Sequence, residues 1–121
     1  MGYRSEVMAA FYADKSKGAA VKLYVDENFP ESLKDSLEPI NNGRYVGYKF
    51  YEADVKWYPS YPEVLAFNIF ASNFLELAEQ EEIAWAYEFV RIGEDSGDIE
   101  ETQSDYADNQ VRVVRNIESD F

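Results

Sequence analysis

The sequence predicts a single α+β domain over residues 1–121, in which a mostly antiparallel sheet of four to five strands is packed by two helices. The length of 121 residues suits one ordinary domain. Apolar residues make up 46% of the chain and aromatic residues 17%, enough to form a real core. Segments with strand-like and helix-like apolar spacing follow the order β-α-β(β)-α-β-β. This order is typical of an α+β sandwich, and ferredoxin-like packing is one candidate.

The first strand is predicted over residues 3–12, YRSEVMAAFY. Val7, Ala9 and Phe11 alternate along it and therefore share one face. A turn follows at residues 14–18, where Ser16 is a candidate helix N-cap.

The first helix is predicted over residues 19–29, because Val21 and Val25 lie on one stripe at helical spacing. Pro30 ends or redirects this helix. Residues 31–37 are expected to form a short second helical piece, which Pro39 ends.

Residues 44–58 are the most strand-like part of the chain. The segment is either one long bulged strand or a hairpin that turns near residues 52–54. A hairpin or a sharp bend is preferred, because fifteen residues are long for one straight strand. A second helix is predicted from Ser60, with Glu63 completing a capping box, to about Gln80. Its apolar stripe consists of Val64, Phe67, Phe70, Ala71, Phe74, Leu75 and Ala78.

A strand is predicted over residues 85–92, and the chain then becomes strongly acidic. Residues 94–108 read as a long acidic loop or an irregular hairpin, with a short strand possible at residues 99–102. Residues 110–117, QVRVVRNI, are predicted to form the last strand.

The absence of cysteine and histidine excludes several kinds of site. Disulfides, thiolate zinc sites, Cys nucleophiles, Ser-His-Asp triads and HExxH motifs all require these residues. The sequence also lacks a P-loop and a glycine-rich dinucleotide fingerprint. Carboxylate pairs that could serve a glycosidase are expected by chance among 24 acidic residues. We therefore predict no enzyme activity, no catalytic residue and no cofactor.

Calcium binding is a less favoured alternative. Several carboxylates surround Gly97 between residues 94 and 101, and oxygen-rich loops with glycine can hold Ca²⁺. The spacing does not match the EF-hand pattern, so no metal ligands are assigned.

The negative charge is concentrated in one part of the chain. The net charge is −13, and residues 76–108 contain twelve acidic residues against the single base Arg91, a net of −11. A solvated face is the plain explanation, and a surface for a partner is the alternative. Phosphates would be repelled, which disfavours direct binding to nucleic acid and favours a basic protein surface as the partner. The residues expected to contact a partner are Glu79, Glu81, Glu82, Glu94, Asp95, Asp98, Glu100, Glu101, Asp105 and Asp108.

No apolar run approaches the ~20 residues needed to span a bilayer. The first residues lack the features of a signal peptide. We therefore expect a soluble, cytoplasmic protein that does not bind membranes.

Three segments resemble small uncharacterised acidic proteins of tailed bacteriophages and prophages: GYRSEV at residues 2–7, DVKWY at residues 54–58 and YEFVRIGE at residues 87–94. The resemblance would span most of the chain and assigns no site residues. It implies a phage origin and a location in the cytoplasm of an infected bacterium. Small acidic phage proteins include DNA mimics and inhibitors of host enzymes, among them anti-CRISPR and anti-restriction proteins.

The leading hypothesis is therefore a non-enzymatic phage-type interaction protein. It would act as an acidic inhibitor or DNA mimic that binds a basic, nucleic-acid-binding surface of a host protein. Its carboxylates would replace DNA phosphates, which occur about once per ~1.7 Å of duplex. A structural or assembly protein that forms a homodimer through an aromatic-rich sheet is the alternative. Trp57, Tyr58, Tyr61 and Trp85 could then form a contact patch, or they could pack in the core and at its edges.

Overall fold

The computed structural model confirms the predicted α+β fold and describes residues 2–95, 97–113 and 117–119. The main sheet contains β1 (Ser5–Asp14), β2 (Leu37–Asn41), β3 (Tyr45–Val55), β4 (Ala86–Gly93) and β5 (Ile99–Gln103). The helices are α1 (Gly18–Asn28), the short 3-10 helix η1 (Glu31–Ser36) and α2 (Pro62–Ala78). Two short strands, β6 (Val111–Val113) and β7 (Ile117–Ser119), pair with each other as a separate sheet.

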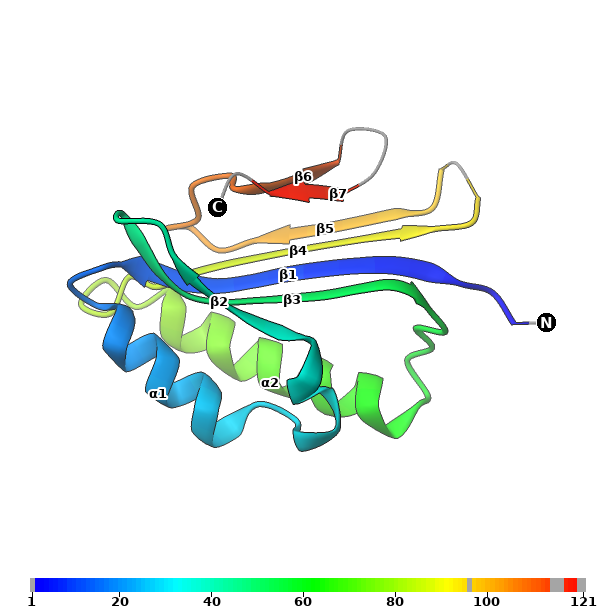
Figure 1. Cartoon of the computed structure of the whole chain (residues 1–121), viewed down its shortest axis with the longest axis horizontal. Helices are drawn as coiled ribbons and strands as arrows, with labels where there is room; N and C mark the ends of the chain where they lie inside the picture. Colours follow the sequence, from blue (N-terminus) through cyan, green and yellow to red (C-terminus); the bar gives the residue numbers. More distant parts are fainter. Residues whose placement is uncertain (1, 96, 114–116, 120–121) are drawn as a thin grey trace.

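The main sheet has the strand order β2-β3-β1-β4-β5, and all neighbouring strands are antiparallel (Figure 1). From β1 to β4 the chain follows the β-α-β-β-α-β succession of a ferredoxin-like domain. Strand β5 folds back beside β4 as a hairpin and forms one edge of the sheet. The acidic part of the chain thus lies partly on an ordered edge strand.

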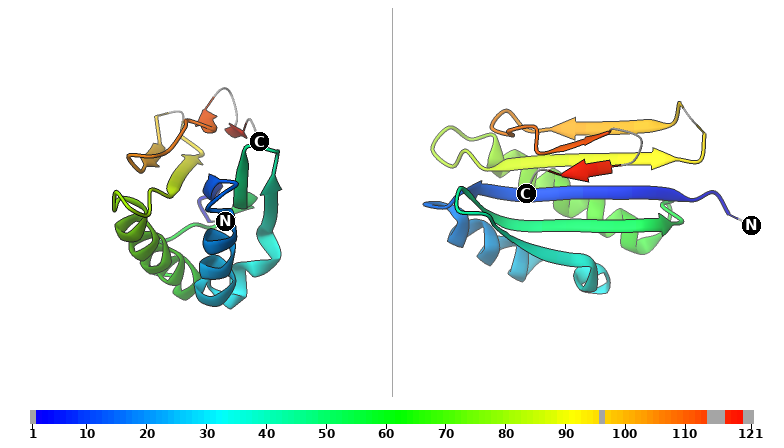
Figure 2. Two further views of the ribbon diagram at one scale, coloured as in Figure 1. Left: turned by 90° about the vertical axis from the view of Figure 1, so that its left-hand side faces the viewer. Right: turned by 45° about the horizontal axis from the view of Figure 1, so that its top comes forward.

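Helices α1 and α2 cover one face of the sheet (Figures 1 and 2). The ring of Phe11, at the centre of β1, lies 5.2 Å from the ring of Phe70 and 5.1 Å from that of Phe74, both edge to face. Such aromatic pairs add about 0.5–1.5 kcal/mol each beyond their buried area. The apolar stripe predicted for the second helix therefore forms the core against β1.

The opposite face of the sheet is covered by the β6–β7 hairpin (Figure 1). Met8 and Tyr12 of β1 are buried there in one cluster with Val111 and Ile117. Because β1 is covered on both faces, its residues read as a continuous apolar run rather than as an alternation. Val7, Ala9 and Phe11 do share the helix-covered face as predicted.

Three predicted elements differ from the structure. The predicted helical piece at residues 31–37 is a 3-10 helix followed by the edge strand β2, which contains Pro39. Proline lacks an N–H, but an edge strand tolerates it. The hairpin preferred near residues 52–54 is wrong, and the alternative of one long bulged strand is confirmed: β3 runs from Tyr45 to Val55 beside β1, and its register shifts between Glu52 and Val55. The single strand predicted over residues 110–117 is also wrong, because β6 and β7 are separate strands; residues 114–116 lie outside the described part of the chain.

The predicted helix caps are not formed. The N-cap positions are Lys17 for α1 and Tyr61 for α2, and neither makes a side-chain capping hydrogen bond. Ser16 and Ser60 each lie one residue earlier. Tertiary packing of the apolar stripes therefore positions these helices without the predicted caps.

Candidate functional site

The predicted partner-binding residues lie mainly along and around β5. Glu94, Asp95 and Asp98 lie at the turn between β4 and β5, and Glu100 and Glu101 lie on β5 itself. Glu79, Glu81 and Glu82 follow α2, close to the end of β5 where Asp105 lies. The pKa of Glu79 is raised, chiefly by a small loss of hydration and to a lesser extent by a hydrogen bond with Asp105 and the negative charge of Asp105. The fold thus brings nine of the ten residues to one edge of the sheet and its two ends.

Arg91 compensates two of these carboxylates. Its guanidinium binds Asp98 in a bidentate manner, at 2.6 and 3.1 Å, and binds Oε1 of Glu100 at 2.6 Å. Arg91 is largely buried, with 12% of its side chain exposed. The pKa of Asp98 is lowered, chiefly by the hydrogen bond from Arg91 and to a lesser extent by the hydrogen bond from the Tyr3 hydroxyl. Asp98 and Glu100 therefore hold the β4–β5 hairpin together.

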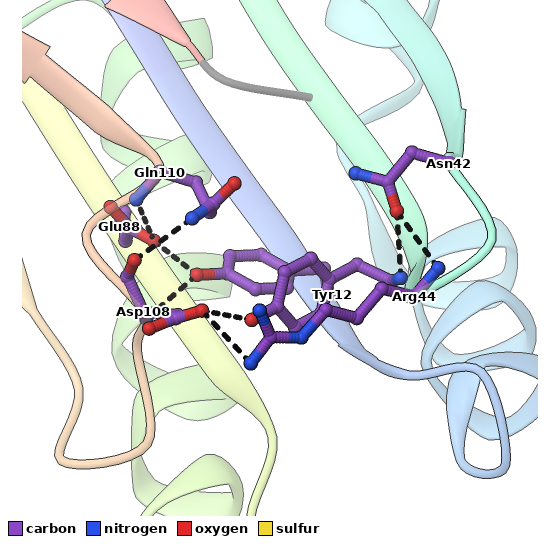
Figure 3. A network of polar contacts seen from close by, with 7 residues as sticks. Tyr12, Asn42, Arg44, Glu88, Asp108 and Gln110 are labelled. Atoms are coloured by element: carbon purple, nitrogen blue, oxygen red, sulfur yellow. Dashed lines mark hydrogen bonds and ion pairs between the residues drawn. The ribbon is translucent and has the colours of Figure 1, made fainter.

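Asp108 lies away from the β5 edge. Its carboxylate accepts a hydrogen bond from the hydroxyl of Tyr45 and lies 3.5 Å from the guanidinium of Arg44, at the start of β3 (Figure 3). Its backbone N–H donates to the hydroxyl of Tyr12 at 2.9 Å. Asp108 thus anchors the segment before β6 to the face of the sheet opposite the helices.

Glu88 is a buried acidic residue that the sequence interpretation missed. It lies in the middle of β4 and is 1% exposed. Its carboxylate accepts hydrogen bonds from the Tyr12 hydroxyl and from the N–H of Gln110 at 3.0 Å (Figure 3). It also accepts one from the N–H of Val111 at 2.9 Å. A lone glutamate between Ala86 and Val90 on one strand face was the available signal. Because its oxygens are occupied by these donors, Glu88 has a structural role.

A cavity of about 380 Å³ lies beside the acidic hairpin, on the helix-covered side of the sheet. Aromatic side chains form much of its wall, among them Trp57, Tyr87 and Phe89. The β5 residues Glu100 and Thr102 line it as well. Its size falls within the usual range of ligand pockets.

Of the four aromatic residues singled out in the sequence, the two tryptophans are buried. Trp57 and Trp85 belong to the core under the helices and are 8% and 9% exposed. Tyr58 and Tyr61 are partly exposed and pack edge to face, with ring centroids 5.0 Å apart. The two tryptophans thus pack in the core, and Tyr61 packs against it.

Within residues 2–95, 97–113 and 117–119, no group of three or more acidic side chains is arranged to hold a metal ion. In the same part of the chain, no helix has the length and apolar character needed to cross a membrane. In comparisons with known proteins, no protein family, no curated protein and no solved structure matches this chain. The resemblance to phage proteins therefore stays a prediction.

Proposed function

We propose that this protein is a non-enzymatic interaction protein that binds a basic surface of a partner protein through the β5 side of its sheet. The proposal rests on one observation: seven exposed carboxylates on ordered backbone surround the edge strand, and none has an ion-pair partner among the described residues. We call these residues the acidic edge: Glu79, Glu81, Glu82, Glu94, Asp95, Glu101 and Asp105.

The acidic edge carries its charges on three neighbouring segments: the residues after α2, the turn between β4 and β5, and β5 with the turn that follows it. DNA likewise presents closely spaced negative charges, one phosphate per ~3.4 Å of axis on each strand. This supports, as the finer form of the proposal, an inhibitor or DNA mimic that occupies a nucleic-acid-binding surface of a host protein.

The alternative of homodimer formation is disfavoured at this edge. Two copies pairing through β5 would bring Glu101 and its acidic neighbours close to the same residues of the second copy. Like charges opposite one another destabilise strand pairing, and charged side chains on edge strands are a common protection against self-association. A basic partner meets no such repulsion.

Capture of binding proteins from a bacterial lysate at low and high salt tests the proposal. The acidic-edge variant carries lysine at Glu94, Asp95, Glu101 and Asp105. These four side chains are exposed, whereas reversal of Asp98 or Glu100 would disrupt the pairs with Arg91. We expect the native protein to retain a basic partner at low salt and release it at high salt, and the variant to retain far less.

The matched control carries lysine at four other acidic residues and therefore has the same net charge as the acidic-edge variant. These residues lie outside the β4–β5 hairpin and make no ion pair in the described part of the chain: Glu27, Asp35, Asp54 and Glu63. The control should retain the partner. Equal capture by both variants would refute binding through the acidic edge.

A further inference from the structure

The cavity beside β5 is lined by a tyrosine whose hydroxyl has no hydrogen-bond partner among the described residues. Tyr87 is 4% exposed, and its ring stacks on that of Phe11 with centroids 5.3 Å apart. Its hydroxyl makes no hydrogen bond within the described residues. Every fully enclosed side-chain oxygen in that part of the chain has a hydrogen-bond partner, so the Tyr87 hydroxyl is not fully enclosed. The hydroxyl must therefore keep contact with solvent, and Tyr87 lines this cavity. A ligand in the cavity would reach an unused hydrogen-bonding group.

The charges around the cavity favour a cation. Arg91 already uses four of its five N–H groups on Ser5, Asp98 and Glu100. Glu100 uses Oε1 on Arg91, while no partner of Oε2 is found in the described part of the chain, and 60% of its side chain is exposed. The lining holds one arginine and two carboxylates, a net charge of −1. An anion would thus find few free donors, and a cation would find a free carboxylate oxygen.

The aromatic wall strengthens this preference. The faces of Trp57, Tyr87 and Phe89 carry negative electrostatic potential and attract a guanidinium or ammonium group placed over them. The planar guanidinium of arginine both stacks on such rings and donates several hydrogen bonds. Tyr87 and Glu100 could accept two of these. An arginine side chain therefore matches the aromatic wall and the charge of the cavity.

The cavity lies directly beside a free strand edge. The N–H of Gly93 donates to the carbonyl of Asp98 at 2.8 Å, and the N–H of Ser104 donates to the carbonyl of Tyr87 at 2.9 Å. Hydrogen-bonded pairs alternate along an antiparallel ladder, so the intervening odd-numbered residues of β5 direct their backbone groups away from β4. These residues are Ile99, Glu101 and Gln103. The N–H of Ile99 donates to the carbonyl of Gly97 at 3.2 Å, so the N–H groups available to an added strand are those of Glu101 and Gln103.

We propose that an extended basic segment of the partner pairs with the free edge of β5 as a sixth strand and inserts an arginine side chain into the cavity lined by Trp57, Tyr87 and Glu100. Side chains of an added strand alternate between the two faces of the sheet. Every second residue would therefore lie on the side of the cavity. The inference rests on the proposed function, because it names how a basic partner reaches the acidic edge.

A synthetic peptide that alternates threonine and arginine over seven residues serves as the probe. Trp57 lines the cavity, so the W85F variant leaves one fluorescent tryptophan at the site. We expect saturable binding that changes the Trp57 fluorescence. The same peptide with citrulline in place of arginine keeps the shape but loses the charge, and it should bind at least tenfold more weakly. Methylation of alternate backbone nitrogens on the side that pairs with β5 should have a similar effect, because it blocks the ladder.

The Y87F substitution in the same background removes the unused hydroxyl and leaves the aromatic packing in place. It should weaken peptide binding about tenfold, since a hydrogen bond to a charged group is lost, without lowering the melting temperature. The E27Q/D35Q/E63Q variant is the control: its three residues lie outside the acidic edge and do not line the cavity, so it should leave the Trp57 fluorescence change at saturation intact.

Two results would overturn the inference. In the first, the peptide binds and the acidic-edge variant weakens binding, but the Y87F substitution does not change the affinity and peptide binding does not change the Trp57 fluorescence. The proposed function would then stand without an arginine pocket. In the second, the native protein shows no peptide binding at low salt. The lysate capture decides the proposed function separately, because it does not depend on Tyr87.

Discussion

The buried carboxylate of Glu88 should contribute strongly to stability, and the E88Q substitution tests this. Three donors converge on the carboxylate: the Tyr12 hydroxyl and the N–H groups of Gln110 and Val111. An amide offers one oxygen, and its NH₂ group must face at least one of these donors. Hydrogen bonds to charged groups contribute about 1.5–3 kcal/mol each. Loss of one bond, with a donor left facing a donor, should lower the free energy of unfolding by about 2–4 kcal/mol.

Urea unfolding followed by circular dichroism at pH 7 measures this loss. The matched control is E101Q, which removes an exposed carboxylate from the same face of the β4–β5 hairpin and should change stability by less than about 0.5 kcal/mol. Hydrogen exchange at the N–H of Val111 should become faster in E88Q, because its acceptor is weakened. Equal unfolding midpoints for E88Q and E101Q would refute the structural role of Glu88.

Three further predictions concern pH and packing. Tyr45 and Tyr51 have pKa values of about 12, the former chiefly through burial and the latter chiefly through a hydrogen bond to a carboxylate. Their pKa in the unfolded chain is about 10, so above pH 10 the unfolded chain binds fewer protons than the folded chain. The melting temperature should therefore fall between pH 10 and 12. A melting temperature that stays constant over this range would contradict the prediction. A Cβ on Gly47 would overlap the backbone of Phe11, so G47A should cost about 1–3 kcal/mol in urea unfolding. R91L removes the main cause of the lowered pKa of Asp98; an NMR titration should show this pKa rising, and no change would contradict the pairing.

The sequence predicted the elements whose pattern is local. The second helix shows its apolar stripe at helical spacing, and Val7, Ala9 and Phe11 alternate along the first strand. Strand β2 was missed because Pro39 argues against a strand unless the segment is an edge, and edge position depends on the whole sheet. The long bulged strand β3 was named only as the less favoured alternative for a related reason, since its length is stabilised by pairing with β1 rather than by its own residues.

The candidate site was predicted only as a charge distribution. The concentration of acids in residues 76–108 was visible, but the sequence could not separate carboxylates that have internal partners from those that do not. That separation depends on distant residues: Tyr12 contacts Glu88, and Tyr3 contacts Asp98. The cavity was not predicted either, because its lining comes from segments as far apart in the sequence as Tyr3 and Thr102.

The division of the acids into two groups connects stability with function. Glu88, Asp98, Glu100 and Asp108 bind groups within the protein, and their contacts hold the β4–β5 hairpin and the segment before β6 in place. The acidic edge makes no ion pair in the described part of the chain, and its mutual repulsion opposes the compact state. Neutralising the first group should unfold part of the structure, whereas neutralising the acidic edge should preserve or slightly raise stability. A loss of partner binding in a stable acidic-edge variant would therefore report on the surface itself, because the fold does not depend on those charges.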